Sequence, residues 1–373
     1  MTDKQRTFLL GAGFSKAVAD GPLMKEIWEY IVKAYENEKN IKVSTNDVSL
    51  RQEWYDELEK FMIELETEIK LRFTRSRFDE IKVLIRENIE YLFTLIDLNL
   101  AGPKVEFKKE GVDVTPYPAI FLRFTGRDRL KNIRRSLITF LYIILINLKE
   151  NDLASEFVKI ITEKDQIITF NYDLVLEKTL WNGNIWSPLD GYAGVVRFKD
   201  ENDRKKLEES NRYSRLKIHK IHGSICWTKP DKILDSHEHL SIELDNIENW
   251  GFHFDGLKDI LGREPISASL SERYEGGHDP TWMLPSFIKP FEYKEFYEIW
   301  KSALKAMSKT DELVIIGYSF RPEDSSAQLL ISSLPDGCNI TLVDPKPENI
   351  KERLDRMGLK VNNTYKLLEE YLS

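Results

Sequence analysis

The sequence is poor in cysteine and has no long apolar run. It contains two cysteines, Cys226 and Cys338, which lie far apart and form no Cys-x-x-Cys pair. This excludes a disulfide scaffold and a zinc site built from cysteine pairs. The most apolar stretch, residues 137–148, has only about a dozen residues, whereas a membrane-spanning helix needs roughly 20. We interpret it as a buried core helix.

The chain also lacks an excess of positive charge. Its 54 Lys and Arg residues are outnumbered by 62 Asp and Glu residues, which gives a net charge of -8. Bulk charge therefore argues against direct nucleic-acid binding. With 373 residues, 42% of them hydrophobic, the chain can bury a sizeable core. The first residues reach a glycine-rich turn after a very short apolar run, unlike a signal peptide, so we expect a cytoplasmic protein without membrane association.

Short apolar segments bounded by polar or glycine residues predict strands of a sheet buried on both faces. The predicted strands are Arg6–Leu10, Gln166–Phe170, Leu216–Ile221, Glu312–Ile316 and Asn339–Val343. Helical patterns fall between the later strands. The order predicts an α/β fold with a Rossmann-like, doubly wound parallel sheet.

Residues 24–163 carry few strand signals. Apolar residues recur there at helical spacing over 25–37, 50–73, 78–98 and 127–149. We therefore predict a large α-helical insertion, with the core formed by residues 1–23 and 164–373. Residues 231–279 are mixed in composition and receive no predicted structure.

A glycine-rich segment, Gly11–Ser15, follows the first predicted strand directly. Glycines at this position let the backbone approach a pyrophosphate, and the next helix presents unpaired amide groups. An ordinary tight turn explains the same residues equally well. No acidic residue ends a second strand some 20 positions later, so the dehydrogenase fingerprint is incomplete. A hydride-transfer enzyme is therefore disfavoured.

Polar side chains end the next two predicted strands. Asn171 and Asp173 follow one of them, where ligands bind in open α/β sheets, although either residue could simply cap a helix. Asparagine can both donate and accept, so it can orient a water or a ribose hydroxyl. His222 ends the other strand, and histidine is well suited to move a proton near neutral pH. If that strand stays extended, His219 points to the opposite face and fits a packed interior position.

Two later strand ends also carry polar residues. Gly317 and Ser319 follow the fourth predicted strand, and Asp344 follows the fifth. Ribose or phosphate contacts are natural roles for them, although such residues are also common helix caps and turn formers. The histidines in the polar region lack helical pairing and nearby cysteines, so no metal site is expected there. They are His237, His239, His253 and His278.

In this order, the motifs Gly-Ala-Gly-Phe-Ser, Asn-Tyr-Asp, His-Gly-Ser and Gly-Tyr-Ser-Phe resemble those of the sirtuin-like NAD hydrolases, within them the prokaryotic anti-phage defence branch. The resemblance implies a sirtuin-like fold with NAD as the substrate. It makes Asn171 and His222 the catalytic pair and places Asp173 at the nicotinamide end. The remaining nucleotide-binding residues that it implies are Gly11, Ala12, Gly13, Phe14, Ser15, Gly317, Ser319 and Asp344.

The chain departs from deacetylating sirtuins in two ways. The four cysteines of the zinc ribbon are missing, and Ala19–Met24 replaces the Pro-Asp-Phe-Arg stretch that follows the glycine turn. Both differences argue against a peptide substrate and against bound zinc. They fit the defence branch, in which water takes the place of the acetyl oxygen.

The leading hypothesis is therefore an NAD glycohydrolase that releases nicotinamide and ADP-ribose, and so depletes NAD in anti-phage defence. The alternatives are a sensor that binds NAD or ADP-ribose without cleaving it, and a protein deacylase, for which no peptide groove is recognisable. A nuclease has the least support. The resemblance also implies self-association and a separately encoded partner, a hexameric DNA-translocase ATPase. We expect the helical insertion to carry such contacts, since the NAD site needs only strand ends and loops.

Overall fold

The protein is described by a computed structural model and divides into two compact units. One unit holds residues 1–23 and most of the chain from Leu145 onward, and the other holds Met24–Ile144. The residues that the structure describes are 4–39, 45–72, 75–101, 107–109, 112–114, 125–192, 196–198, 200–211, 213–214, 216–228, 243–244, 280–282, 294–321 and 324–373.

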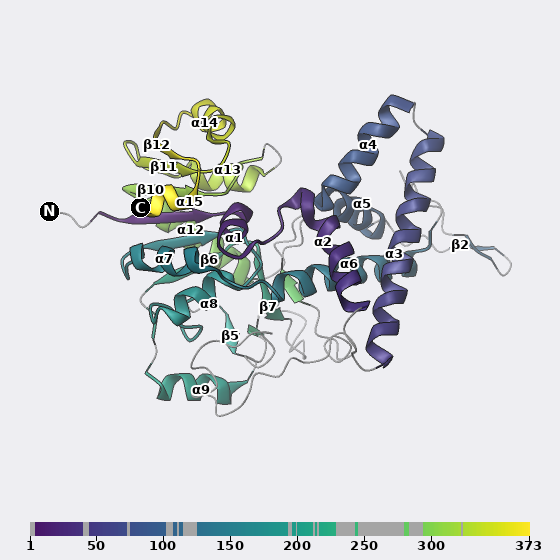
Figure 1. The fold of residues 1–373 in the computed structure, drawn as a ribbon, viewed down its shortest axis with the longest axis horizontal. Helices are drawn as coiled ribbons and strands as arrows, with labels where there is room; N and C mark the ends of the chain where they lie inside the picture. Colours follow the sequence, from purple (N-terminus) through teal and green to yellow (C-terminus); the bar gives the residue numbers. More distant parts are fainter. Residues whose placement is uncertain are drawn as a thin grey trace. The chain divides into compact units, whose positions relative to one another are not determined.

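The first unit is built on a six-stranded sheet in the order β12-β11-β10-β1-β4-β6, whose paired strands are all parallel. Figure 1 shows the purple β1 strand running between the later, yellow-green strands and the teal ones. This confirms the predicted α/β class and the doubly wound sheet. The strands are β1 (Arg6–Leu10), β4 (Gln166–Thr169), β6 (Lys217–Lys220), β10 (Glu312–Ile316), β11 (Asn339–Val343) and β12 (Val361–Tyr365).

The order of the strands places a topological switch point between β1 and β10. From β1 the sheet extends through β4 to β6 on one side, and the chain then returns to β10 and continues outward through β11 and β12. Leu10 pairs in register with both Ile316 and Thr169, so β1, β10 and β4 end at the same level. Ligands of open α/β sheets bind beyond the carboxyl ends of the strands at such a point.

The helices and a smaller sheet complete this unit. The helices are α1 (Ala12–Ala19), α7 (Asp152–Ile160), α8 (Val175–Asn182), α9 (Glu201–Glu209), α12 (Lys294–Met307), α13 (Ser325–Ile331), α14 (Pro347–Arg356) and α15 (Leu368–Leu372). The smaller sheet has the order β5-β8-β7-β9, with β5 (Arg197–Phe198), β7 (Gly223–Thr228), β8 (Glu243–Leu244) and β9 (Pro280–Trp282).

Helix α7 belongs to the sheet unit, although the sequence placed it in the insertion, whose predicted end was residue 163. Asn151 caps α7 by accepting from the amide of Leu153, and its own amide groups donate to carbonyls at the end of α1. The ring of Phe157 packs edge-on against Phe8 and Phe14. These contacts bind α7 to β1 and α1, so the boundary between the units falls at residues 144 and 145.

The second unit begins at Met24 and is mainly helical. Its elements are η1 (Met24–Glu26), α2 (Ile27–Lys39), α3 (Thr45–Arg72), α4 (Arg75–Glu87), α5 (Ile89–Ala101), β2 (Phe107–Lys109), β3 (Val112–Val114) and α6 (Arg127–Ile146), the last of which runs into the boundary. Arg129 bridges Glu57 and Glu64 of α3, both at 2.5 Å. The apolar run of α6 is largely buried, in line with its interpretation as a core helix.

One predicted helix, over 78–98, is two helices. Asn88 separates α4 from α5, and its side-chain oxygen accepts from the amide of Glu90 at 3.0 Å. Asparagine is a favoured N-cap because this hydrogen bond satisfies an amide at the start of the helix. Among the described helices none is long and apolar enough to cross a membrane.

Candidate functional site

The loops that follow β1 and β10 lie in direct contact at the switch point. The amide of Gly11 donates to the carbonyl of Ile316 at 3.0 Å, and that of Gly13 donates to the carbonyl of Gly317 at 2.9 Å. A Cβ on Gly13 would lie 2.5 Å from Cα of Gly317, and one on Gly11 would lie 2.6 Å from its carbonyl oxygen. Only glycine fits at this approach.

These contacts give the glycine-rich segment a packing role in addition to the nucleotide-binding role predicted for it. The amides of Gly11 and Gly13 are engaged by the neighbouring strand and loop, and that of Phe14 donates to the carbonyl of Gly11 at 2.9 Å. In this conformation each of the three amides donates to a carbonyl of the protein. The ring of Phe14 is buried. The glycines allow the loops after β1 and β10 to pack together at the end of the sheet.

This packing predicts an unequal pair of glycine substitutions. Gly317 and Gly358 both have positive φ, +60° and +77°, but a Cβ would meet backbone atoms at 2.4 Å at Gly317 and nothing within 4 Å at Gly358. Gly358→Ala should cost only the conformational strain, about 1 kcal/mol. Gly317→Ala adds overpacking and should lower the free energy of unfolding by about 1–3 kcal/mol more. Chemical denaturation of both variants measures the difference, and equal losses would contradict the close approach.

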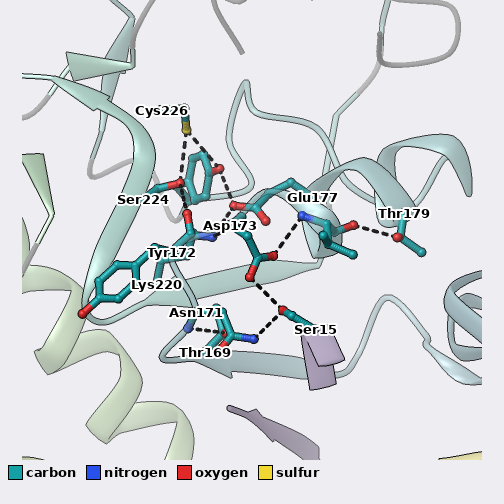
Figure 2. A network of polar contacts seen from close by, with 12 residues as sticks. Ser15, Thr169, Asn171, Tyr172, Asp173, Glu177, Thr179, Lys220, Ser224 and Cys226 are labelled. Carbon is teal, nitrogen blue, oxygen red and sulfur yellow. Dashed lines mark hydrogen bonds and ion pairs between the residues drawn. The ribbon is translucent and has the colours of Figure 1, made fainter. Parts of the chain in front are cut away.

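A chain of hydrogen bonds joins the end of β4 to helix α1 (Figure 2). Nδ2 of Asn171 lies 2.9 Å from both the carbonyl oxygen of Gly11 and Oγ of Ser15. Oγ of Ser15 donates in turn to Oδ2 of Asp173 at 2.7 Å. The other carboxylate oxygen of Asp173 accepts from the amide of Val175, the first residue of α8, at 3.1 Å. Thus the structure brings together three of the predicted site residues, Ser15, Asn171 and Asp173.

The partners of Asn171 fix the direction of its side-chain amide. The carbonyl of Gly11 can only accept, so the nitrogen of Asn171 must face it. Ser15 gives its hydrogen to Asp173, so it too accepts from Asn171. Both hydrogens of the amide are used. Oδ1 of Asn171 is therefore the atom with which this side chain can address a ligand, and it can act only as an acceptor.

His222 lies against aromatic rings on either side of Asn171 in the sequence. Its ring centroid is 5.0 Å from that of Phe170, edge-on, and 6.2 Å from that of Tyr172, nearly parallel. The side chain is buried, with 7% of its surface exposed. The ring of Tyr318, from the loop after β10, stacks on that of Phe170, with 4.0 Å between the ring centroids. The histidine is thus held near the carboxyl end of β4, where Asn171 also lies.

His219 occupies an interior position, for a reason that differs from the one expected. Strand β6 ends at Lys220, so strand alternation does not extend to His222. Instead, His219 is 2% exposed, and its Nε2 lies 3.3 Å from Oε1 of Gln166. Burial, with a smaller contribution from the charge of Lys217, lowers the pKa of His219 from 6.5 to about 4.

This shift predicts a pH-dependent loss of stability. Between pH 6.5 and about 4 the unfolded chain binds a proton at His219 that the folded chain does not, so the free energy of unfolding falls as the pH is lowered. The contribution is about 3 kcal/mol, present in full above pH 6.5 and lost by about pH 4. His219→Gln should remove it. Denaturation of parent and variant at pH 7 and pH 4 tests this, and identical pH dependences would contradict it.

The comparisons with known proteins bear on the same elements. A family model described as a SIR2-like domain matches residues 165–335. The chain carries a SIR2-like domain. The match spans β4, the segment with Asn171 and Asp173, the turn with His222, and the loop after β10. A SIR2-like domain implies NAD binding, which agrees with the sirtuin-like resemblance of the motifs. No curated protein matches the chain.

The predicted adenosine-side residues follow the ends of β10 and β11. Ser319 is exposed, and its carbonyl accepts from Nη1 of Arg353 at 2.6 Å. Oδ1 of Asp344 accepts from the amide of Lys346 at 2.8 Å, and burial raises the pKa of this carboxyl. Ala12 is exposed at the start of α1. Among the described residues no hydrogen bond joins Ser319 or Asp344 to Asn171.

The sequence analysis missed buried residues that hold the segment with Asn171 and Asp173 from within the protein. Lys220 donates to the carbonyl of Asp173 at 2.5 Å and pairs with Glu177 at 2.8 Å, and Tyr192 donates to the same carboxylate at 2.8 Å. A lysine at the end of an apolar strand was the available signal. Tyr318 lay inside a recognised motif but was not selected. The described residues include no group of three or more His, Cys, Asp or Glu side chains that could hold a metal ion.

Proposed function

We propose that the chain is an NAD glycohydrolase, which cleaves the bond between nicotinamide and ribose to give nicotinamide and ADP-ribose. The family match supports NAD as the ligand. The observation that carries the choice of reaction is the fixed amide of Asn171, whose Oδ1 is left as an acceptor at the carboxyl end of the sheet. Hydrolysis needs a water molecule that is oriented before the bond breaks, and a fixed acceptor provides this.

Asn171 would hold the attacking water by accepting one of its hydrogens. The water then keeps a lone pair directed at the ribose carbon that carries nicotinamide. As the carbon–nitrogen bond lengthens, positive charge develops on the ribose, and nicotinamide leaves with the bonding electrons as a neutral molecule. Oδ1 of Asn171 carries partial negative charge and would favour this transition state. The alternative partner of Oδ1 is a ribose hydroxyl, which would fix the sugar instead of the water.

His222 would take the proton that the water loses as its oxygen bonds to the ribose carbon. An imidazole is the side chain best suited to accept a proton near neutral pH. The rings of Phe170 and Tyr172 bury it and restrict access of bulk solvent. The balance is one NAD and one water consumed, with nicotinamide, ADP-ribose and a proton released. Asp173 and Ser15 would hold Asn171 in place and do not exchange protons in this scheme.

The nucleotide would extend from this centre toward β10 and β11. We assign Ala12 and the loop of Gly11, Gly13 and Gly317 to the phosphates, and Ser319 and Asp344 to the adenosine side. In the cell, the proposed activity would deplete NAD in anti-phage defence. We further propose self-association and a hexameric DNA-translocase ATPase as partner. These cellular roles rest on the sirtuin-like resemblance of the motifs.

The test is to incubate the purified protein with NAD and to measure NAD binding and nicotinamide release in the same samples. We expect nicotinamide and ADP-ribose in equal amounts. NAD that binds but stays intact would contradict the hydrolase and would favour a sensor. Acetylated peptide should not accelerate nicotinamide release. A large stimulation by peptide would favour a deacylase.

A further inference from the structure

An ion pair with no exposed surface lies behind the proposed site. Nζ of Lys220 is 2.8 Å from Oε1 of Glu177, and the exposed fraction of each side chain is 0%. Tyr192 donates to the same oxygen of Glu177. Figure 2 shows Glu177 beside Asp173, on the side away from Ser15. The ion pair thus adjoins the segment that presents Asn171.

This ion pair is poorly suited to stabilise the fold. Removing two charges from water costs several kcal/mol for each ion, which a buried pair recovers only when the remaining polar atoms are satisfied. Oε2 of Glu177 has no hydrogen-bond partner among the residues that the structure describes. Burial accordingly raises the pKa of this carboxyl, against the opposing charge of Lys220. An apolar set of similar volume would avoid these costs, so the pair points to a role other than stability.

The second contact of Lys220 supplies such a role. Its Nζ donates to the carbonyl oxygen of Asp173 at 2.5 Å, and the amide of Ile225 in β7 donates to the preceding carbonyl, of Tyr172, at 3.0 Å. On the opposite side, the side chains of Asn171 and Asp173 bind Gly11 and Ser15. The segment is therefore clamped through its backbone on one side and through its side chains on the other.

We propose that Lys220 is a positioning residue, which holds the carbonyl of Asp173 and thereby aims Oδ1 of Asn171, with Glu177 as its buried counter-charge. The kinetic consequence rests on the proposed NAD hydrolysis. The position of Oδ1 is set by the backbone of the segment Asn171–Asp173, and misplacement of a catalytic group by about 1 Å can cost about 100-fold in rate. Lys220 itself touches neither the substrate nor the water.

The decisive variant replaces the whole buried group, E177M/Y192F/K220M, so that no charge or hydroxyl is left unpaired. Its midpoint of chemical denaturation should equal or exceed that of the parent, because apolar replacement of a buried ion pair is often neutral or stabilising. Its kcat should nevertheless fall about 100-fold, with KM changed less than about threefold. A stable triple variant with the parent's kcat would overturn the proposal.

Arg6→Met is the matched control. Arg6 also pairs with a carboxylate at 2.8 Å, Asp165, and donates to a backbone carbonyl at 2.6 Å, that of Ile160. These contacts lie at the amino end of β1, away from the strand ends that form the site. The variant should lose stability and keep kcat. If the triple variant and Arg6→Met lost kcat alike, Lys220 would have no special role and the proposal would fail.

Amide hydrogen exchange separates this proposal from the proposed function. The amide of Asn171 donates to Oγ1 of Thr169 at the end of β4, and the amide of Val175 donates to Oδ1 of Asp173. In the triple variant their exchange should accelerate at least about tenfold, with β10 and β11 unchanged, since local opening frees them. Unchanged exchange at both amides would overturn the positioning role, whatever the activity. If the parent releases no nicotinamide, the hydrolase proposal fails and the exchange result alone decides the positioning role.

Discussion

Asn171→Ala should reduce nicotinamide release from NAD by roughly 100- to 1000-fold, the usual cost of removing one preorganised polar group from a reacting centre. The variant loses the acceptor Oδ1 that we assign to the attacking water. The fold should persist, because Asn171 lies at the end of β4 and is only partly buried. Nicotinamide release at saturating NAD, with circular dichroism to verify folding, provides the measurement.

Ser15→Ala is the graded control for Asn171→Ala. It removes one of the two acceptors that fix the amide and leaves the carbonyl of Gly11 in place at 2.9 Å. The rate should fall about tenfold, well short of the effect of Asn171→Ala. A folded Asn171→Ala protein that hydrolyses NAD at the parent rate would refute the assignment of Oδ1.

His222→Ala should lower the rate by roughly 100- to 10,000-fold, the range typical of a lost general base. His219→Ala, three residues earlier in the same segment, should leave kcat within about threefold, since its side chain is buried against Gln166. The comparison uses initial rates of nicotinamide release at neutral pH. Equal losses in the two variants would mean that the segment matters for folding alone.

The strands of the sheet were predictable from the sequence wherever both faces are buried. In β10 and β11 four of five residues are buried in each strand, so the apolar runs mark their bounds. Strand β12 was missed because it lies at the edge of the sheet. Only Val361 is buried in it, and its sequence lacks the apolar run that marks the inner strands. Helix α1 was not predicted, because it begins at Ala12, within the glycine-rich segment.

Only the part of the site that depends on the ends of the strands could be predicted from the sequence. Their order brought Asn171 and Asp173 to the carboxyl edge, but the hydrogen bonds to Ser15 depend on the packing of α1 against that edge. The role of Lys220 was hidden for the same reason. Its partner Glu177 lies on α8, and no local pattern tells which helix face a strand residue will meet. The four histidines within residues 231–279, for which no metal site was expected, lie outside the described residues.

The most direct test of the central claim is a time course of NAD with the parent protein and with Asn171→Ala, followed by proton NMR. The account predicts that the parent converts NAD into nicotinamide and ADP-ribose in a 1:1 ratio and that the variant binds NAD but leaves it essentially intact. If the parent leaves NAD intact under conditions where binding is demonstrated, or if both proteins release nicotinamide equally fast, the proposed hydrolytic site is contradicted.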